Sequence, residues 1–340
     1  MGDERIARVL GTSCIRSELI GAAYADNTWK KVDSALNTFE HFTREKKINV
    51  SWPLNVDVVS QFINWATFSR DLSPSTIVSY LSHLKLVHKL RGLDYSGVSN
   101  FICKTQIRGA QNLAFYDDFQ HGNKKVMTLP LLQILGHQIA SKDWSAHSKI
   151  VVWCAYNVAF FGSFRFGEIV APSEHSFNKY ETLLWSDVQF FDDGSICIHN
   201  KIPKTRVEKG EFISLFEFPD HNCCPVQALK CLKELSNIKG SEQTPVFTFS
   251  NGKFLTCKKA NKLLTHFLEP HLGEEAASYS CKSFRAALPS ALSSFPFLGN
   301  EKSIKRWGRW TSNAYERYTR LNHRARKEIF TRFAEALSRT

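Results

Sequence analysis

Two tyrosines, Tyr315 and Tyr318, lie among arginines in the stretch GRWTSNAYERYTR, which runs from Gly308 to Arg320. A tyrosine in such surroundings is either a packed ring whose hydroxyl reaches solvent, or a nucleophile held against a phosphate. The phenol has a pKa of about 10 and is therefore a weak nucleophile at neutral pH. The nucleophilic interpretation requires cationic groups elsewhere in the chain that neutralise the charge developing on the phosphate.

Cationic side chains with helical spacing occur upstream of these tyrosines. Arg165 and Glu168, in SFRFGEIV, are three residues apart and are expected to share a helix face, where the carboxylate can orient the guanidinium. Lys282 and Arg285, in CKSFR, have the same spacing and begin an expected helix, whose first N–H groups favour an anion. Lys204 follows an expected strand, and a β-turn there can direct its ammonium into a site. Taken singly, the Arg165–Glu168 pair is an ordinary helical salt bridge, the Lys282–Arg285 pair is a solvated pair, and Lys204 is a surface lysine.

The order of the candidates is more informative than any one of them. Along the chain they read Arg, Lys, Lys-x-x-Arg, Trp and Tyr, and this order resembles the tyrosine recombinases, the family of Cre and the phage-type integrases. The resemblance implies a catalytic set of Arg165, Glu168, Lys204, Lys282, Arg285, Trp310 and Tyr318. The ending GRWTSNAYERYTR is most similar to recombinases of DIRS-type retrotransposons and crypton-type elements, in which Gly-Arg-Trp precedes a Tyr eight places on. Trp310 by itself also fits a core position.

The resemblance implies a role for each residue at a DNA phosphodiester. Arg165 and Arg285 would donate to the non-bridging oxygens, with Lys282 and the indole of Trp310 as further donors. Lys204 would protonate the departing 5′ oxygen. The product would be a 3′-phosphotyrosine and a free 5′ hydroxyl, so that no cofactor, ATP or metal is required. Four protomers would then exchange strands through a Holliday junction.

The family spacing selects Tyr318 as the nucleophile and leaves Tyr315, three residues earlier on the same expected helix face, as a packing or helper residue. Two departures from the family pattern affect the expected geometry. Lys282 stands where most members have a histidine, and a cationic lysine is a worse base for the tyrosine proton. The gap of eight residues from Trp310 to Tyr318 is one shorter than in Cre.

Hydrophobic periodicity predicts a mainly α-helical protein with a small antiparallel β-sheet. Helices are expected from Trp29, with Asn27 or Thr28 as the N-cap, after Pro53, and from Pro74 to Gly92 with Ser73 as the N-cap. Further helices are expected over 100–113, 130–140, 148–161, 225–235, 257–267 and from 283 to the end, with strands within 182–191, 195–200 and 210–218.

The polar segment that begins at Tyr116 has no helical period and predicts a linker. The expected organisation is a helical core-binding domain over 1–115, a linker over 116–127, and a catalytic domain over 128–340 that includes a C-terminal helix. This is the two-domain clamp of the tyrosine recombinases, in which the domains grip opposite faces of double-stranded DNA. The resemblance reaches the helix LSPSTIVSYLSHLKLVHKLRGL and so covers nearly the whole chain.

A net charge of +12 and an isoelectric point of about 9.2 predict an acidic partner, with nucleic acid first. From Glu301 onward, eleven basic residues face four acidic ones. The candidate DNA contacts are Ser79, His83, Lys85, Lys89, Lys104 and Arg108 in the first domain, and Lys201 and Arg309 in the second. Each also fits an ordinary surface position, and Lys201 is the second choice for the hairpin lysine. The C-terminal helix has an apolar stripe at Ile329, Phe330, Phe333 and Leu337. It either folds back on its own domain or, as the family resemblance implies, docks in a neighbouring protomer and so contributes to a tetramer on DNA.

Several other classes of protein and site are disfavoured. The nine cysteines lack metal-ligand spacing, and the chain shows neither a secretory h-region nor an apolar run long enough to cross a membrane. We expect a nuclear protein if the host is eukaryotic and a cytoplasmic one otherwise. The alternatives that stay open are a type IB topoisomerase, a telomere-resolving enzyme, and a domesticated DNA-binding protein without catalysis.

Overall fold

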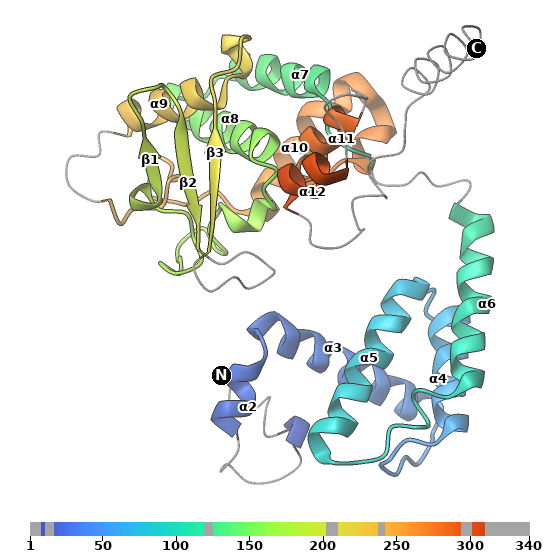
Figure 1. Ribbon diagram of the computed structural model, residues 1–340. Helices are drawn as coiled ribbons and strands as arrows, with labels where there is room; N and C mark the ends of the chain where they lie inside the picture. The colour runs from blue at the N-terminus through green and yellow to red at the C-terminus, as the bar shows by residue number, and fades with distance from the viewer. Residues whose placement is uncertain are drawn as a thin grey trace, which may run out of the picture. The chain divides into compact units, whose positions relative to one another are not determined.

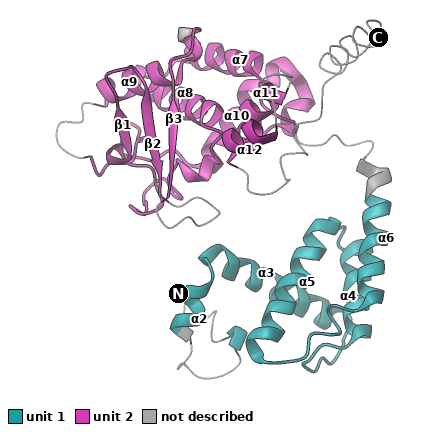
Figure 2. Cartoon of the chain, viewed as in Figure 1, with its two compact units in different colours: residues 1–122 teal, residues 123–340 magenta. Residues whose placement is uncertain are grey.

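The computed structural model describes residues 8–10, 17–118, 125–201, 210–236, 242–293 and 301–309 of the chain. The chain divides into two compact units, residues 1–122 and 123–340 (Figure 2). The division lies inside the segment expected to be a linker, but helix α6 continues to Asp118. The last three residues of α6 therefore belong to the segment predicted to be a linker.

The first unit consists of helices around one core (Figure 1). They are α2 (Ser17–Ala23), α3 (Asp26–Glu45), α4 (Val56–Phe68), α5 (Pro74–Arg91) and α6 (Phe101–Asp118). The apolar stripe of α3 is buried, and its Phe39 and Phe42 rings lie 5.3 Å and 5.5 Å from the ring of Phe62 on α4. Helix α5 begins and ends as predicted, with the Ser73 hydroxyl accepting from the Thr76 N–H and Gly92 at φ 69°. The predicted cap of α3 is wrong, because α3 begins at Asp26 after Ala25, whose side chain has no group that can cap it.

The second unit combines a three-stranded antiparallel sheet with helices. The strands are β1 (Val188–Phe190), β2 (Ile196–Asn200) and β3 (Glu211–Leu215), in the order β1-β2-β3. The helices are α7 (Leu129–Ala140), α8 (Ala146–Phe161), α9 (Pro225–Leu235), α10 (Cys257–Leu272), α11 (Ala287–Ser293) and α12 (Glu301–Gly308). Helix α8 runs through the middle, with the strands on one side and α10, α11 and α12 on the other (Figure 1). The sheet turns Ile196, Ile198, Ile213 and Leu215 into the same core as α8.

Two predicted elements of this unit differ from the structure. The segment 182–191 holds a 3₁₀ turn, η3 (Trp185–Asp187), before a strand of only three residues. The helix expected from residue 283 onward is broken into a 3₁₀ turn, η6 (Cys281–Phe284), and the separate helices α11 and α12. Pro289 explains part of this break, because it has no N–H to donate to the Arg285 carbonyl and must lie in the first turn of a helix.

Candidate active site

The predicted pair Arg165 and Glu168 lies directly after α8, in a tight reversal of the chain. Gly162 ends α8, and a Cβ at this position would lie 2.3 Å from the buried ring of Phe164. Ser163 follows with φ 48°, in the left-handed region that non-glycine residues rarely adopt. The reversal leads into a 3₁₀ turn, η2 (Phe166–Glu168), with Arg165 at its N-cap. The expected α-helical face is therefore a 3₁₀ turn, which also brings residues three apart together.

The Glu168 carboxylate holds Arg165 at two points. Its Oε2 accepts from the Arg165 backbone N–H at 3.0 Å, and its Oε1 accepts from Arg165 Nη1 at 2.7 Å. The carboxylate is nearly buried, whereas the side chain of Arg165 is 35% exposed. Among the described residues, only Glu168 bonds to the Arg165 guanidinium.

Arg285 and Lys282 share the η6 region but have different surroundings. Arg285 is 7% exposed, and its Nη1 donates to the Ser163 carbonyl at 2.5 Å. Its Nη2 donates to the carbonyl of Arg309 at 3.2 Å. Lys282 is exposed. The structure therefore brings Arg285 to the Arg165 turn from a segment 122 residues away.

Arg309, expected on the sequence to contact DNA, is directed into the protein. Its Nη2 donates to Glu168 Oε2 at 2.7 Å and to the Ser163 carbonyl at 3.0 Å, while Nη1 donates to Glu211 Oε2 at 2.8 Å. The guanidinium also lies over the Phe164 ring, 4.8 Å from its centroid. Its side chain is only 9% exposed. Among the described residues, the acceptors of this guanidinium are two carboxylates and one backbone carbonyl, and the contact of Arg309 with DNA stays a prediction.

We call this cluster the arginine node; it consists of Arg165, Glu168, Arg285, Arg309, Glu211 and the carbonyl of Ser163. It contains three guanidinium groups and two carboxylates, an excess of one positive charge. Burial, followed by repulsion from Arg309 and Arg165, lowers the pKa of Arg285 to about 9. Burial alone raises the pKa of Glu168, but the nearby arginines outweigh it and the net shift is downward. An anion at the exposed edge of Arg165 would relieve the repulsion among the guanidinium groups.

The rest of the predicted catalytic set lies outside the described residues. These positions are Lys204, Trp310 and Tyr318, together with Tyr315 and the C-terminal helix. Lys204 belongs to the segment 202–209, which connects the paired strands β2 and β3. Lys201, the second choice for the hairpin lysine, has its Nζ 2.6 Å from Asp187 Oδ2 and 2.6 Å from the carbonyl of Lys179.

The DNA contacts predicted for the first unit lie on α5 and α6 but remain predictions. On α5, the ammonium groups of Lys85 and Lys89 lie 4.6 Å and 5.3 Å from the centroid of the Tyr95 ring. The His83 Nδ1 and the Ser79 carbonyl are 2.6 Å apart. On α6, Lys104 and Arg108 are exposed.

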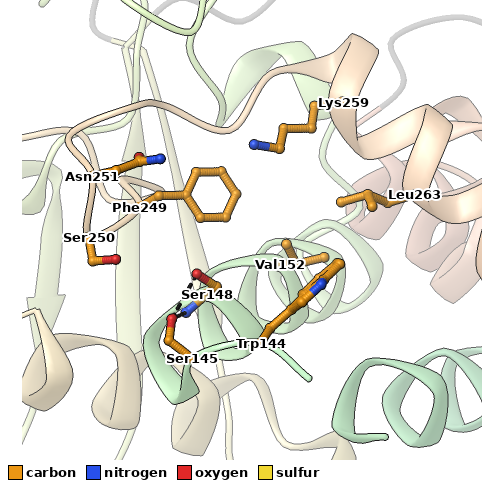
Figure 3. A pocket seen from close by; sticks show the side chains of 9 residues that line it. All are labelled: Trp144, Ser145, Ser148, Val152, Phe249, Ser250, Asn251, Lys259 and Leu263. Atoms are coloured by element: carbon orange, nitrogen blue, oxygen red, sulfur yellow. Dashed lines mark hydrogen bonds between the residues drawn. The ribbon is translucent and has the colours of Figure 1, made fainter. Parts of the chain in front are cut away.

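A cavity of about 380 Å³ lies between the start of α8 and α10 (Figure 3). Trp144, Phe249 and Leu263 form apolar walls, and the Lys259 ammonium lies 4.2 Å from the Phe249 centroid. None of the arginine node lines this cavity. Within the described ranges, no group of side chains is arranged to hold a metal ion and no helix is long and apolar enough to span a membrane.

Sequence reasoning missed Ser163 and Glu211 and gave Arg309 a different role. Ser163 acts through its carbonyl and Glu211 comes from β3, so neither has a local motif. For Arg309 the sequence does carry one signal. Arg309 lies nine residues before Tyr318, whereas Trp310 lies eight residues before it. The gap from Arg309 therefore equals the gap from the tryptophan to the tyrosine in Cre, which is one residue longer than the gap from Trp310.

No family model matches the sequence, and no curated protein matches it. Solved structures do match the fold. The XerH site-specific recombinase in its post-cleavage complex with palindromic difH gives a TM-score of 0.60 at 14% identity, covering 97% of this chain and 88% of that one. The XerH pre-cleavage complex gives 0.57 at 14% identity, covering 96% and 88%. A lambda integrase tetramer bound to a Holliday junction gives 0.53 at 10% identity, covering 94% and 76%. The chain therefore has the fold of the two-domain tyrosine recombinases.

Proposed function

We propose that this protein is a site-specific DNA recombinase that cleaves and rejoins DNA through a covalent 3′-phosphotyrosine on Tyr318. The observation that carries the proposal is the arginine node. It holds three guanidinium groups against two carboxylates and leaves Arg165 partly exposed. Buried excess positive charge destabilises a fold unless an anion neutralises it, and a DNA phosphodiester is an anion whose non-bridging oxygens accept hydrogen bonds from guanidinium groups.

In the proposed reaction, the Tyr318 hydroxyl releases its proton to solvent as its oxygen bonds to the scissile phosphorus, and the bond from phosphorus to the 5′ oxygen breaks. Arg165 and Arg285 stabilise the non-bridging oxygens, and Lys282 and Trp310 add hydrogen-bond donors. Lys204 gives its proton to the departing 5′ oxygen. The phosphate ester to Tyr318 conserves the bond energy, so that a 5′ hydroxyl of another strand can reverse the step without ATP.

The proposed partners are double-stranded DNA and further copies of this chain. Of the similar structures, one XerH complex is post-cleavage on difH and the lambda integrase is a tetramer on a Holliday junction. By analogy, we propose that the two units clamp a duplex and that four protomers assemble on two sites, with the C-terminal helix contributing to assembly. The ending GRWTSNAYERYTR further favours a transposable element of the DIRS or crypton type, which acts in the nucleus if the host is eukaryotic.

The decisive test uses nicked suicide duplexes cut from the DNA that flanks the gene, because cleavage of such a substrate traps the covalent intermediate. We expect an adduct that survives denaturing electrophoresis with the native chain and with Tyr315→Phe, and none with Tyr318→Phe. Tyr315 is the matched control, since it is the same residue type three positions away. An adduct lost in Tyr315→Phe and kept in Tyr318→Phe would show that the nucleophile was wrongly chosen. The absence of any adduct with the native chain would refute the enzymatic function.

A second assay separates recombination from the related chemistry of a type IB topoisomerase. With two flanking-DNA sites on one supercoiled plasmid, a recombinase produces rearranged circles or catenanes. A topoisomerase would relax plasmids with or without the sites and would exchange no strands. Relaxation alone would leave the phosphotyrosine chemistry in place and overturn the recombinase function.

A further inference from the structure

We propose that Arg309 is a positioning residue, which locks the segment leading to Tyr318 onto the arginines that bind the phosphate. The inference rests on the proposed function and deepens it, because it assigns the coupling between the nucleophile segment and the phosphate site to one side chain. Arg309 directly follows α12 and is nine residues before Tyr318.

The guanidinium of Arg309 joins three segments that are far apart in the sequence. It donates to the Ser163 carbonyl 146 residues away, to Glu168 141 residues away, and to Glu211 98 residues away. The Glu168 carboxylate that receives Arg309 on Oε2 also receives Arg165 on Oε1. Arg309 therefore fixes the carboxylate that orients Arg165.

Arg309 also acts on the second arginine, through its backbone. Arg285 is held by two carbonyls, those of Ser163 and Arg309. Both residues that supply these carbonyls have positive φ, 48° at Ser163 and 53° at Arg309. The other positive-φ non-glycine residues in the described ranges, Lys47 and Asp71, follow the ends of α3 and α4. Left-handed backbone at non-glycine residues persists only where the surroundings enforce it, and here it points two carbonyls at one guanidinium.

The same contacts argue against a direct role of Arg309 on DNA. Both of its terminal nitrogens have protein partners, and its side chain is 9% exposed against 35% for Arg165. Two of those partners are the carboxylates of Glu168 and Glu211, which offset the charge of Arg309, whereas the Arg285 guanidinium donates to backbone carbonyls. In the proposal, the effect of Arg309 on the phosphate therefore passes through Arg165 and Arg285.

The test replaces Arg309 by lysine, which keeps the charge but removes the planar fork that bridges three acceptors. The matched control is Arg306→Lys, on α12 and three residues before Arg309, because Arg306 is exposed. The rate constant for cleavage of the suicide duplex is measured at saturating DNA, in single turnovers. This rate constant does not depend on the fraction of protein that is folded. That fraction changes only the amount of covalent product formed in the single turnover. DNA affinity and its salt dependence are measured separately with Tyr318→Phe added, so that no covalent product forms.

We expect Arg309→Lys to lower the cleavage rate constant about 100-fold relative to Arg306→Lys, as displacement of a reacting group by about 1 Å does. DNA affinity and its salt slope should match those of the control. A rate constant within threefold of the control would overturn the inference while the native adduct still supported the recombinase. Weaker binding and a smaller salt slope than the control, with an unchanged rate constant, would overturn it in favour of a DNA contact. No adduct from the native chain would remove both the function and the inference.

A second variant keeps the proposal testable if Arg309→Lys does not fold. Glu211→Gln replaces a carboxylate that pairs with Arg309 by a neutral amide, while Glu168 and Ser163 remain. We expect a loss of about fivefold to tenfold in the cleavage rate constant, again with unchanged affinity. Where both single variants fold, the double variant should cleave no more slowly than Arg309→Lys alone, because Glu211 acts through Arg309. Additive losses, or no loss in Glu211→Gln, would refute this coupling.

Discussion

Each unit buries polar side chains, but the two do so in opposite ways. In the first unit, His88 is fully buried and satisfied at both ring nitrogens: Nε2 accepts from the Leu54 N–H at 3.0 Å, and Nδ1 donates to the Leu84 carbonyl at 2.8 Å. The ring is held neutral and lies 4.6 Å from that of Trp52. In the second unit, the arginine node carries excess positive charge, and its backbone is held at positive φ in two places.

This difference separates a structural polar group from a functional one. A neutral histidine with a hydrogen bond at each ring nitrogen contributes to folding and needs no ligand. A buried cluster with unbalanced charge lowers stability, and a protein keeps it only where the charge is used. Substitutions at the two sites should therefore have opposite signatures: loss of activity with little loss of stability in the node, and the reverse at His88.

The largest effect is expected for Arg285→Gln. Removing a donor preorganised for the phosphate should lower the cleavage rate constant by about 10³-fold. The pKa of Arg285 is lowered to about 9 by burial and by its neighbouring arginines, which means that its charged form is disfavoured in the fold. A neutral side chain removes this penalty, so the thermal midpoint should stay level or rise. If Arg285→Gln instead lowered the thermal midpoint strongly and left the cleavage rate constant unchanged, Arg285 would be a structural residue and the contrast with His88 would be wrong.

His88→Gln should show the opposite signature. Glutamine cannot hold the Leu54 N–H and the Leu84 carbonyl with the geometry of the ring, so we expect a loss of about 1–3 kcal/mol in the stability of the first unit. The rate constant for cleavage at saturating DNA should not change. Hydrogen exchange at the Leu54 amide reports the local effect, because this amide is bonded to His88. Slow exchange at Leu54 in the variant would mean that the histidine is dispensable.

The same histidine predicts a pH dependence confined to the first unit. Burial, the largest cause, lowers the pKa of His88 below 6.5, with a smaller opposing effect from the Leu84 carbonyl. The unfolded state therefore binds more protons, and stability is lost as the pH falls from about 6.5 through the folded pKa. The loss can reach about 1.4 kcal/mol per pH unit. Intrinsic amide exchange slows as the pH falls through this range, so the effect is read from the protection factor of the Leu54 amide, which should fall with decreasing pH. His88→Gln should abolish this fall.

The sequence predicted those features that depend on neighbours along the chain. Ser73, Pro74 and Gly92 set the limits of α5 because capping hydrogen bonds and positive φ are local requirements. The contact between Arg165 and Glu168 was predictable for the same reason, since residues three apart meet on both α- and 3₁₀ turns.

The architecture of the node was not predictable in this way. Its bonds from Arg309 span 98 to 146 residues, and no local pattern relates Glu211 on β3 to a loop after α12. The acceptor role of Ser163 is a backbone property, because its carbonyl direction depends on a φ of 48° that the residue type does not favour. The sequence made Arg309 a candidate DNA contact, but a basic charge does not show that its guanidinium donates to Glu168 and Glu211.

The smallest effect is expected where the charge does face outward. Lys104 and Arg108 are exposed on α6, so each can approach a phosphate without rearrangement. We expect Lys104→Gln and Arg108→Gln each to weaken DNA binding a few-fold in the Tyr318→Phe background, and to reduce the slope of log affinity against log salt by about 0.9. Lys30→Gln on α3 is the control, because Lys30 is exposed but pairs with Asp26 and lies outside the predicted contacts. The cleavage rate constant at saturating DNA should be the same in all three variants, since a phosphate contact on the first unit adds affinity and leaves the arginine node intact. Equal salt slopes for the control and for both α6 variants would place the DNA on another face of the first unit.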